Sequence, residues 1–235
     1  MRKSPLIIGH RGCRYPGIPE NSSAAVERAV QEDADIVEMD IVTTKDGVFV
    51  AFHYSPLAPR GAHLRRRTVS ELAHVETMES LLGVLASRKA VYLDIKEKLS
   101  TEQLATLRSI VQAMHRNDVI VGSFHTSVLT ACQALAPHWT INLHCFATMS
   151  AVRRAASLGA HWINPMPFLV TESFVRCAQA HDLKFVPAGN ENDAKQLRYA
   201  ELGAYALSTF RPARLRRLVG KCDCCGSPEE QDTDD

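Results

Sequence analysis

The feature that most constrains the fold is a regular alternation of strand-like and helix-like segments in the second half of the chain. Short runs rich in β-branched and aromatic residues are each followed by apolar residues at helical spacing. Such repeated βα units predict a parallel sheet covered by helices, because parallel strands need a crossover connection. The predicted strands begin near residues 90, 119, 140, 161, 184 and 204, and the predicted helices span 77–88, 101–115, 126–135, 149–158, 171–181, 191–201 and 212–219.

The first part of the chain adds two more βα units. Leu6–Gly9 predicts a buried strand, Glu20-Asn21-Ser22 offers an N-cap for a helix ending near Asp33, and a second strand begins at Ile36. Eight such units favour an α/β fold, a (β/α)8 TIM barrel, with the second arm of a hairpin left over as an extra strand after strand 2. A doubly wound open sheet is the alternative.

The extra strand belongs to a predicted β-hairpin around Asp46-Gly47, which reads as a two-residue turn between two strand-like runs. In that register Asp40 lies opposite His53, and the period of two places Glu38 on the same face. Adjacent carboxylates repel each other, so a partly buried pair requires a cation, and all-oxygen ligation favours Mg²⁺ or Ca²⁺. An exposed hairpin with a solvated polar face is the alternative.

Charged residues and histidines gather where the predicted strands end, which is where a (β/α)8 barrel has its active site. These residues are His10, Arg11, Glu38, Asp40, His53, Asp94 and Lys96. A divalent ion, an arginine and a lysine neutralise the charge of a phosphodiester, and two histidines exchange protons with the attacking and leaving oxygens. The set therefore indicates phosphodiester hydrolysis, whereas each residue alone is more often structural.

Six ordered motifs contain these residues: His10-Arg11-Gly12, Pro19-Glu20-Asn21-Ser22, Glu38-Met39-Asp40, Thr44-Lys45-Asp46-Gly47, Phe52-His53 and Leu93-Asp94-Ile95-Lys96. Together they resemble the glycerophosphodiester phosphodiesterase family. The resemblance implies a (β/α)8 barrel, one divalent ion (Mg²⁺ or Ca²⁺), and hydrolysis of a glycerophosphodiester to an alcohol and a glycerol phosphate. It also implies residue roles: His10 and His53 as the acid–base pair, Arg11 and Lys96 as phosphate contacts, Glu38, Asp40 and Asp94 as metal ligands, and Glu20 as a ligand or an orienting group.

The chain departs from the family pattern in places that bear on the substrate. Asp94 stands where the family usually has Glu, as in the related sphingomyelinase D branch, and the segments 54–57, 187–190 and 208–212 lack expected acidic or tryptophan residues. In a barrel these segments lie on the rim around the site. The departures therefore predict a difference in the part of the substrate beyond the phosphate.

A basic loop follows His53 and carries Arg60, Arg65, Arg66 and Arg67. It favours glycerophosphoinositol, glycerophosphoglycerol or a lysophospholipid over glycerophosphocholine as the small-molecule substrate, because a cationic head group gains little from arginines. A merely solvated basic loop is the alternative. Other functions left open are a lysophospholipase D or sphingomyelinase D-like phosphodiesterase and a catalytically silent barrel that binds a phosphodiester.

Composition bounds the remaining expectations. The chain has 235 residues, 46% hydrophobic content and a net charge of +1, so no nucleic-acid partner is expected from its overall field. Its apolar runs are too short for a secretory leader or a transmembrane helix, so we expect no stable membrane insertion. Its seven cysteines are interpreted as reduced thiols, so we expect a cytoplasmic protein. We assign residues 1–220 to one barrel domain and 221–235 to a disordered acidic tail that contains Cys222, Cys224 and Cys225. The role of this tail and the oligomeric state of the protein stay open. A protein that acts through its tail, as an interaction protein, is a third class of function.

Overall fold

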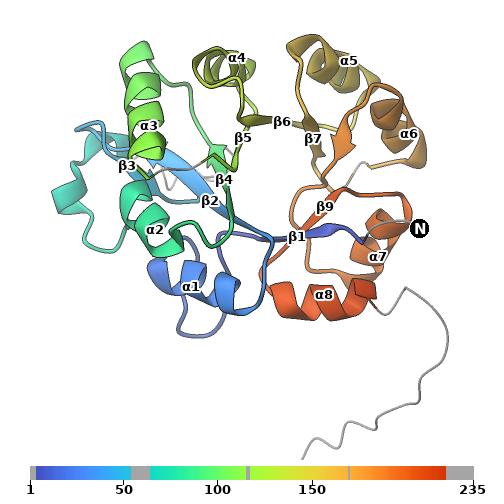
Figure 1. Ribbon diagram of the computed structural model, residues 1–235, viewed down its shortest axis with the longest axis horizontal. Helices are drawn as coiled ribbons and strands as arrows, with labels where there is room; N and C mark the ends of the chain where they lie inside the picture. Colours follow the sequence, from blue (N-terminus) through green and yellow to red (C-terminus); the bar gives the residue numbers. More distant parts are fainter. Residues whose placement is uncertain (1–3, 54–63, 115–116, 169, 221–235) are drawn as a thin grey trace, which may run out of the picture.

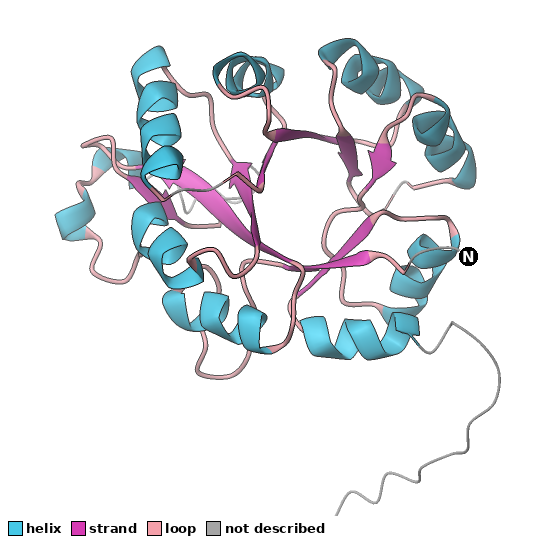
Figure 2. Ribbon diagram, viewed as in Figure 1, coloured by secondary structure: helices cyan, strands magenta, loops and turns pink. Residues whose placement is uncertain are grey.

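The computed structural model describes residues 4–53, 64–114, 117–168 and 170–220. In these ranges the strands form a central ring and the helices lie around its outside (Figures 1 and 2). The elements in chain order are β1 (Leu6–Gly9), α1 (Ser23–Gln31), β2 (Ile36–Thr43), β3 (Phe49–Ala51), α2 (Met78–Leu85), β4 (Ala90–Ile95), α3 (Thr101–Ala113), β5 (Val119–Ser123), α4 (Thr126–Leu135), β6 (Thr140–Cys145), α5 (Met149–Leu158), β7 (Trp162–Pro165), α6 (Glu172–Ala180), β8 (Lys184–Phe185), α7 (Asp193–Glu201), β9 (Ala206–Thr209) and α8 (Pro212–Gly220), with short 3₁₀ turns at Leu64–Arg66 and Val69–Glu71.

The sheet is a nearly closed barrel of eight parallel strands. Its strand order is β8-β7-β6-β5-β4-β2-β1-β9, and β3 adds to β2 as the extra antiparallel strand. Between β8 and β9 the Tyr205 backbone N–H donates to the Phe185 carbonyl oxygen at 2.8 Å. The predicted (β/α)8 barrel with an extra hairpin strand is therefore confirmed, and the open-sheet alternative is excluded.

Helix starts are set by side chains in the loops that follow the strands. Each capping side chain accepts a hydrogen bond from a backbone N–H of the first helical turn, which satisfies a donor that has no partner inside the helix. The caps are Ser22, Thr77, Ser100, Thr148, Thr171 and Asn192, for α1, α2, α3, α5, α6 and α7. The predicted bounds of α4 and α5 are correct to the residue.

The inside of the barrel changes from apolar to polar along the strands. An apolar cluster of Ile8, Ile36, Tyr92, Ile120, Trp162, Val186 and Ala206 fills one end. Because the strand period is two, the residue two positions further along points inward at the next level. At that level stand His10, Glu38, Asp94, Asn164 and Ser208. The polar level lies at the carboxyl ends of the strands, where barrel enzymes bind their substrates.

The predicted hairpin forms, but its predicted register is wrong by one residue. Thr43 pairs with Phe49 and Ile41 with Ala51, so Phe52, rather than His53, lies opposite Asp40. The turn holds three residues instead of two: Thr44 N donates to the Val48 carbonyl oxygen at 3.0 Å, and Gly47 adopts a φ of 79°. A three-residue turn with a left-handed glycine is the next most common hairpin connection, and an Asp-Gly pair fits both.

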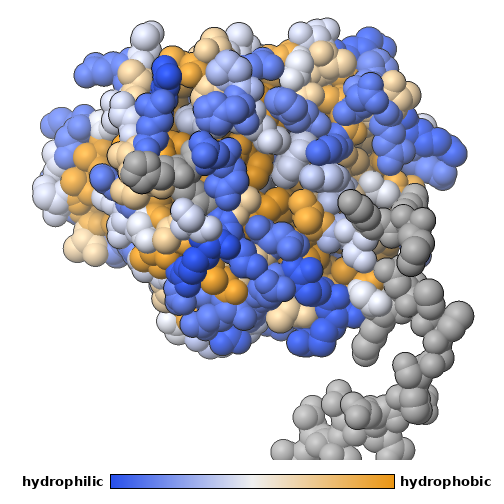
Figure 3. All heavy atoms as spheres, in the orientation of Figure 1, coloured by the Kyte–Doolittle hydropathy of each residue, from blue (hydrophilic) through white to orange (hydrophobic). Residues whose placement is uncertain are grey.

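The face of the molecule in the space-filling view of Figure 3 is mostly hydrophilic, with apolar residues showing between hydrophilic ones. Among the described helices, none is both long and apolar enough to cross a membrane. Two features of the sequence lie outside the described residues, namely the segment 54–63 with Arg60 and the tail 221–235 with its three cysteines.

Candidate active site

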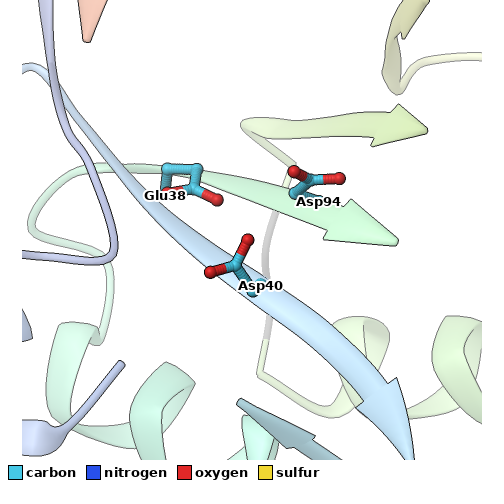
Figure 4. A group of neighbouring side chains, drawn as sticks. All are labelled: Glu38, Asp40 and Asp94. Carbon is cyan, nitrogen blue, oxygen red and sulfur yellow. The ribbon is translucent and has the colours of Figure 1, made fainter. Parts of the chain in front are cut away.

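Three buried carboxylates from two neighbouring strands form the centre of the site. Glu38 and Asp40 come from β2 and Asp94 from β4, and Figure 4 shows their side chains turned toward one another. Asp40 and Asp94 are direct cross-strand partners. One oxygen from each carboxylate lies within 4.8 Å of the others, and the residues are only 4%, 0% and 7% exposed. The structure thus brings together the three residues predicted as metal ligands.

Two cations lie against this cluster. Lys96 Nζ is 2.7 Å from Asp40 Oδ1 and also contacts Asp94 Oδ2. Arg11 Nε is 3.0 Å from Asp40 Oδ2, and Arg11 Nη1 donates to Glu20 Oε1 at 2.7 Å. Glu20 therefore contacts the guanidinium that lies against Asp40, an arrangement that suits the orienting role among the two predicted for it.

The loop after β1 holds Arg11 in a sparsely populated backbone conformation. Arg11 has a φ of 53°, in the left-handed region that is unfavourable for residues other than glycine. In this conformation its backbone N–H donates to Glu38 Oε2 at 2.7 Å, while its carbonyl oxygen accepts from Asn21 N at 3.0 Å. Both the backbone and the side chain of Arg11 thus engage the acidic cluster.

The charges in the cluster are unevenly distributed. Burial raises the pKa of Glu38 well above its ordinary value, and repulsion from Asp40 and Asp94 adds to this. Burial also raises the pKa of Asp40, but Lys96 and Arg11 outweigh it and hold that pKa below its usual range. The pKa of Lys96 rises because the carboxylates outweigh the burial that would lower it. The two cations therefore do not offset the combined effect of burial and carboxylate repulsion at Glu38.

A divalent cation fits this site. Among the described residues, Asp94 Oδ1 is buried and has no hydrogen-bond partner, and His144 Nδ1 lies 3.6 Å from it. A buried carboxylate oxygen without a donor is unusual and requires an explanation. Carboxylate oxygens are the ligands that Mg²⁺ and Ca²⁺ prefer, and an added double positive charge would keep Glu38 ionised. Glu38, Asp40 and Asp94 can therefore hold one divalent ion.

His10 stands at the end of β1 beside the cluster. Its Nε2 lies 4.0 Å from Glu38 Oε2, and its ring packs on Phe210 with centroids 4.7 Å apart. A Cβ at Gly189 would lie 2.8 Å from His10 Nδ1, so the absence of a side chain there makes room for the imidazole. Burial and the neighbouring Arg11 lower the pKa of His10 to about 3, so the ring is neutral at physiological pH.

His53 is half-buried beside the same charges, just beyond the end of β3. Burial lowers its pKa; Asp40 opposes that shift, while Arg11 and Lys96 add to it. His53 also lowers the pKa of His10, as two neighbouring imidazoles do when either is protonated. The two histidines are thus electrostatically linked, although the predicted hairpin register that placed His53 opposite Asp40 does not hold.

A buried hydrogen-bond network behind the cluster was absent from the sequence-based prediction. Asn142 Nδ2 donates to the Tyr92 hydroxyl at 2.7 Å, and that hydroxyl lies 2.5 Å from His144 Nε2. His144 Nδ1 in turn faces Asp94. Asn142 and His144 stand two positions apart in a strand that is otherwise apolar in this stretch, and this spacing was the available signal.

Asn21 was predicted only as part of a cap and a motif, yet it binds the centre of the site. Its Nδ2 donates to Asp40 Oδ2 at 2.9 Å, and its Oδ1 accepts from Asp40 N at 3.0 Å. Phe210 was likewise missed, because nothing near it in sequence indicates that its ring meets His10. Only the closure of β9 against β1 brings these two residues together.

The described part of the basic loop is partly held in place by an ion pair. Arg65 forms an ion pair with Glu97, a carboxylate only 4% exposed that also accepts a hydrogen bond from Thr43 N at 2.8 Å. Arg66 and Arg67 are exposed. Arg65 is therefore held in an ion pair, although its side chain is exposed like those of Arg66 and Arg67.

Comparisons with known proteins agree with this geometry. The model of the glycerophosphoryl diester phosphodiesterase family matches residues 10–63. A glycerophosphodiester phosphodiesterase of Caldanaerobacter subterraneus is 23% identical over 92% of this chain and 98% of its own. A phosphodiesterase of Oleispira antarctica, solved with the product sn-glycerol-3-phosphate, has a TM-score of 0.83 at 18% identity over 92% of this chain and 97% of its own. A glycerophosphodiester phosphodiesterase of Parabacteroides distasonis has a TM-score of 0.83 at 17% identity over 94% and 99%.

The two structural likenesses show the shared barrel fold, and the sequence match covers the segment that carries His10, Glu38, Asp40 and His53. Fold, acidic cluster and sequence match together define a barrel enzyme of the phosphoric diester hydrolase class. Within that class, the chain is similar to the glycerophosphodiester phosphodiesterase family, through the sequence match at its N-terminal part and the full-length relative.

Proposed function

We propose that this protein hydrolyses a glycerophosphodiester to an alcohol and a glycerol phosphate, using a divalent metal ion and the His10/His53 pair. The observation that carries the proposal is the buried cluster of Glu38, Asp40 and Asp94, with one donor-free oxygen on Asp94 and two cations beside it. Such a site has little use in a purely structural role, because buried carboxylates are costly unless they are paired.

Glu38, Asp40 and Asp94 would hold Mg²⁺ or Ca²⁺, and the bound ion would supply positive charge that neutralises the phosphate oxygens. Lys96 Nζ donates to Asp94 Oδ2 and forms an ion pair with Asp40, and since an ammonium has three N–H donors, a donor remains for a phosphate oxygen. Arg11 also keeps donors beyond those that meet Asp40 and Glu20. Both side chains are therefore suited to binding the phosphate.

The proton transfers fall to His10 and His53. Neutral imidazole is the form that accepts a proton, and the low pKa of His10 keeps it in that form. One histidine would take the proton from the attacking hydroxyl or water, and the other would give a proton to the leaving alkoxide. The glycerol phosphate bound to the Oleispira antarctica protein supports this choice of product.

The test is a panel of glycerophosphoinositol, glycerophosphoglycerol and glycerophosphocholine, assayed with Mg²⁺, with Ca²⁺ and with EDTA. Release of glycerol phosphate and free alcohol that stops in EDTA supports the proposal. A protein that binds these diesters without turning them over with either ion would instead be a silent phosphodiester-binding barrel. We expect glycerophosphocholine to have the lowest kcat/KM of the three diesters. In the Arg66→Ala/Arg67→Ala variant, the kcat/KM values of the three diesters should lie closer together.

A second candidate, a lysophospholipase D-like activity of the same site, is favoured by the exposed apolar side chains on the rim. The proposal also includes a cytoplasmic location, since Cys13, Cys132, Cys145 and Cys177 are free thiols, as is usual in a reducing compartment. Cell fractionation followed by immunodetection tests the location.

A further inference from the structure

The loops at one side of the barrel mouth expose an unusual set of aromatic side chains. Phe124 follows β5, Phe146 follows β6 and Phe168 lies in the loop after β7, and they are 49%, 57% and 59% exposed. We call these three residues the phenylalanine arc. Met149, at the start of α5, is 38% exposed and is the remaining large apolar side chain exposed in the described part of the chain. Single exposed apolar residues are common, but here they share one edge of one mouth.

The arc is continuous because its strands are neighbours. β5 pairs with β6 and β6 with β7, so residues just beyond their carboxyl ends follow each other along the rim. The rings of Phe146 and Phe168 have centroids 6.4 Å apart. At the usual strand spacing, the arc spans on the order of 10 Å of the rim.

One end of the arc reaches the proposed metal site. The Phe124 ring meets His144 edge to face, with centroids 5.4 Å apart, and His144 Nδ1 lies 3.6 Å from Asp94 Oδ1. A substrate whose phosphate lies at Glu38, Asp40 and Asp94 is therefore one side chain away from the first ring of the arc. Arg66 and Arg67 belong to the segment between β3 and α2, where the Arg67 carbonyl oxygen accepts a hydrogen bond from Lys45 N, so they lie beside the β2–β3 hairpin and apart from the strands that carry the arc.

We propose that the phenylalanine arc binds the acyl chain of a single-chain glycerophosphodiester lipid, a lysophospholipid, whose phosphodiester lies at the acidic cluster. This inference rests on the proposed function and names a substrate class for the same site. The bond broken is the ester bond between phosphorus and the head-group oxygen. Water supplies hydroxide to the phosphorus and a proton to the head-group alcohol, so the products are that alcohol and an acylated glycerol phosphate.

The size of the arc favours an acyl chain over a protein partner. Three half-exposed phenylalanine side chains present on the order of 300 Å² of apolar surface. A stable protein interface buries about 1,000 Å² or more, whereas a single alkyl chain needs only a narrow apolar track. Its continuity with the phosphate site places that track where the acylated glycerol of such a lipid would leave the mouth.

The expected signature is a dependence on acyl-chain length. A methylene that leaves water for an apolar surface gains up to about fourfold in affinity. Lysophospholipids of short and medium chain, held below their micelle-forming concentrations, should therefore show kcat/KM rising by about tenfold or more across the series. The deacylated glycerophosphodiester with the same head group is the reference substrate.

Paired variants isolate the arc. Phe146→Ala/Phe168→Ala should raise KM for the longest-chain substrate by about tenfold more than KM for the deacylated reference, while Phe146→Leu/Phe168→Leu should keep the chain-length dependence. Both side chains are more than half exposed, so the protein should keep its melting temperature, which circular dichroism checks. Calorimetric titration with the same lipids in EDTA measures the acyl-chain contribution without turnover.

The outcomes separate this inference from the proposed function. Hydrolysis of the deacylated diester without any chain-length dependence in turnover or binding would overturn the inference and leave the proposed function standing. Turnover of neither substrate would reject the proposed function, and the titration would then still decide whether the arc binds acyl chains. A further experiment is co-sedimentation of the protein with phosphatidylglycerol vesicles that contain no lysophospholipid. Binding that is lost in the alanine variant would mean that the arc docks on a membrane, and would also overturn the inference.

Discussion

The Tyr92 hydroxyl lies 2.5 Å from His144 Nε2, although β5 separates the two strands that carry these residues. Asn142 donates to the Tyr92 hydroxyl, and His144 Nδ1 faces Asp94, so a neutral imidazole that accepts the Tyr92 proton at Nε2 would carry its own proton on Nδ1, toward Asp94. Burial lowers the pKa of His144, which keeps this neutral form. The pair crosses β5 over Gly122, where a Cβ would lie 2.5 Å from both side chains.

Gly122→Ala should therefore destabilise the protein by about 1–3 kcal/mol, because the added methyl group forces Tyr92 and His144 apart in a packed interior. Gly83 in α2 is the matched control, since a Cβ there would have no heavy atom of the described residues within 4 Å. Gly83→Ala should stabilise by about 0.5–1 kcal/mol through helix propensity. Urea denaturation measures both. An unchanged free energy of unfolding in Gly122→Ala would mean that the Tyr92–His144 network has room to relax.

Glu38→Gln should leave the melting temperature of the metal-free protein nearly unchanged, because the raised pKa of Glu38 makes the neutral amide a close mimic of the protonated acid. The same variant should lose the increase in melting temperature that Mg²⁺ or Ca²⁺ gives the unmodified protein, since a ligand charge is gone. Differential scanning fluorimetry with and without EDTA reads both effects. An increase equal to that of the unmodified protein would remove Glu38 from the ligand set.

His10→Ala and His53→Ala should each lower kcat by about a hundredfold or more, the usual range for a group that transfers a proton in the transition state. A substrate with p-nitrophenolate as leaving group needs no protonation of that group. It should restore activity in the variant that lacks the acid and leave the other variant impaired. Equal rescue of both variants would contradict a division of acid and base roles between the two residues.

The metal-free protein should lose stability as the pH falls below about 6.5. The folded-state pKa of His10 is lowered to about 3 from an ordinary 6.5, and those of His53 and His144 are also lowered, so the unfolded chain binds more protons in this window. The raised pKa of Glu38 would increase the free energy of unfolding as the pH falls, but it is a single group acting against three histidines.

Urea midpoints measured across this pH range in EDTA test the expectation, with His10→Gln as the comparison. That variant should show a shallower slope of the free energy of unfolding against pH, because one of the three lowered histidines is absent. An unchanged slope would place the origin of the acid sensitivity elsewhere.

The amino-acid sequence was sufficient to predict the order of strands and helices, since strand and helix periods and N-cap residues are local signals. Ser22 and Thr148 cap helices at the positions where the pattern begins them. The sequence also predicted that Glu38 and Asp40 share a face, because a strand has a period of two. The carboxyl ends of β1, β2 and β4 then had to bring His10, Asp40 and Asp94 to one edge.

The contacts that depend on packing across strands could not be predicted from local signals in the sequence. The hairpin register was one, because Asp46-Gly47 fits turns of two and of three residues, and the structure uses Asp46 Oδ1 to accept from Thr44 Oγ1 at 2.6 Å and from Val69 N at 3.1 Å. The approach of Tyr92 to His144 over Gly122 was another, as was the stacking of Phe210 on His10. The high pKa of Glu38 likewise arises from burial beside two further carboxylates, and burial is a property of the assembled barrel rather than of any segment of the chain.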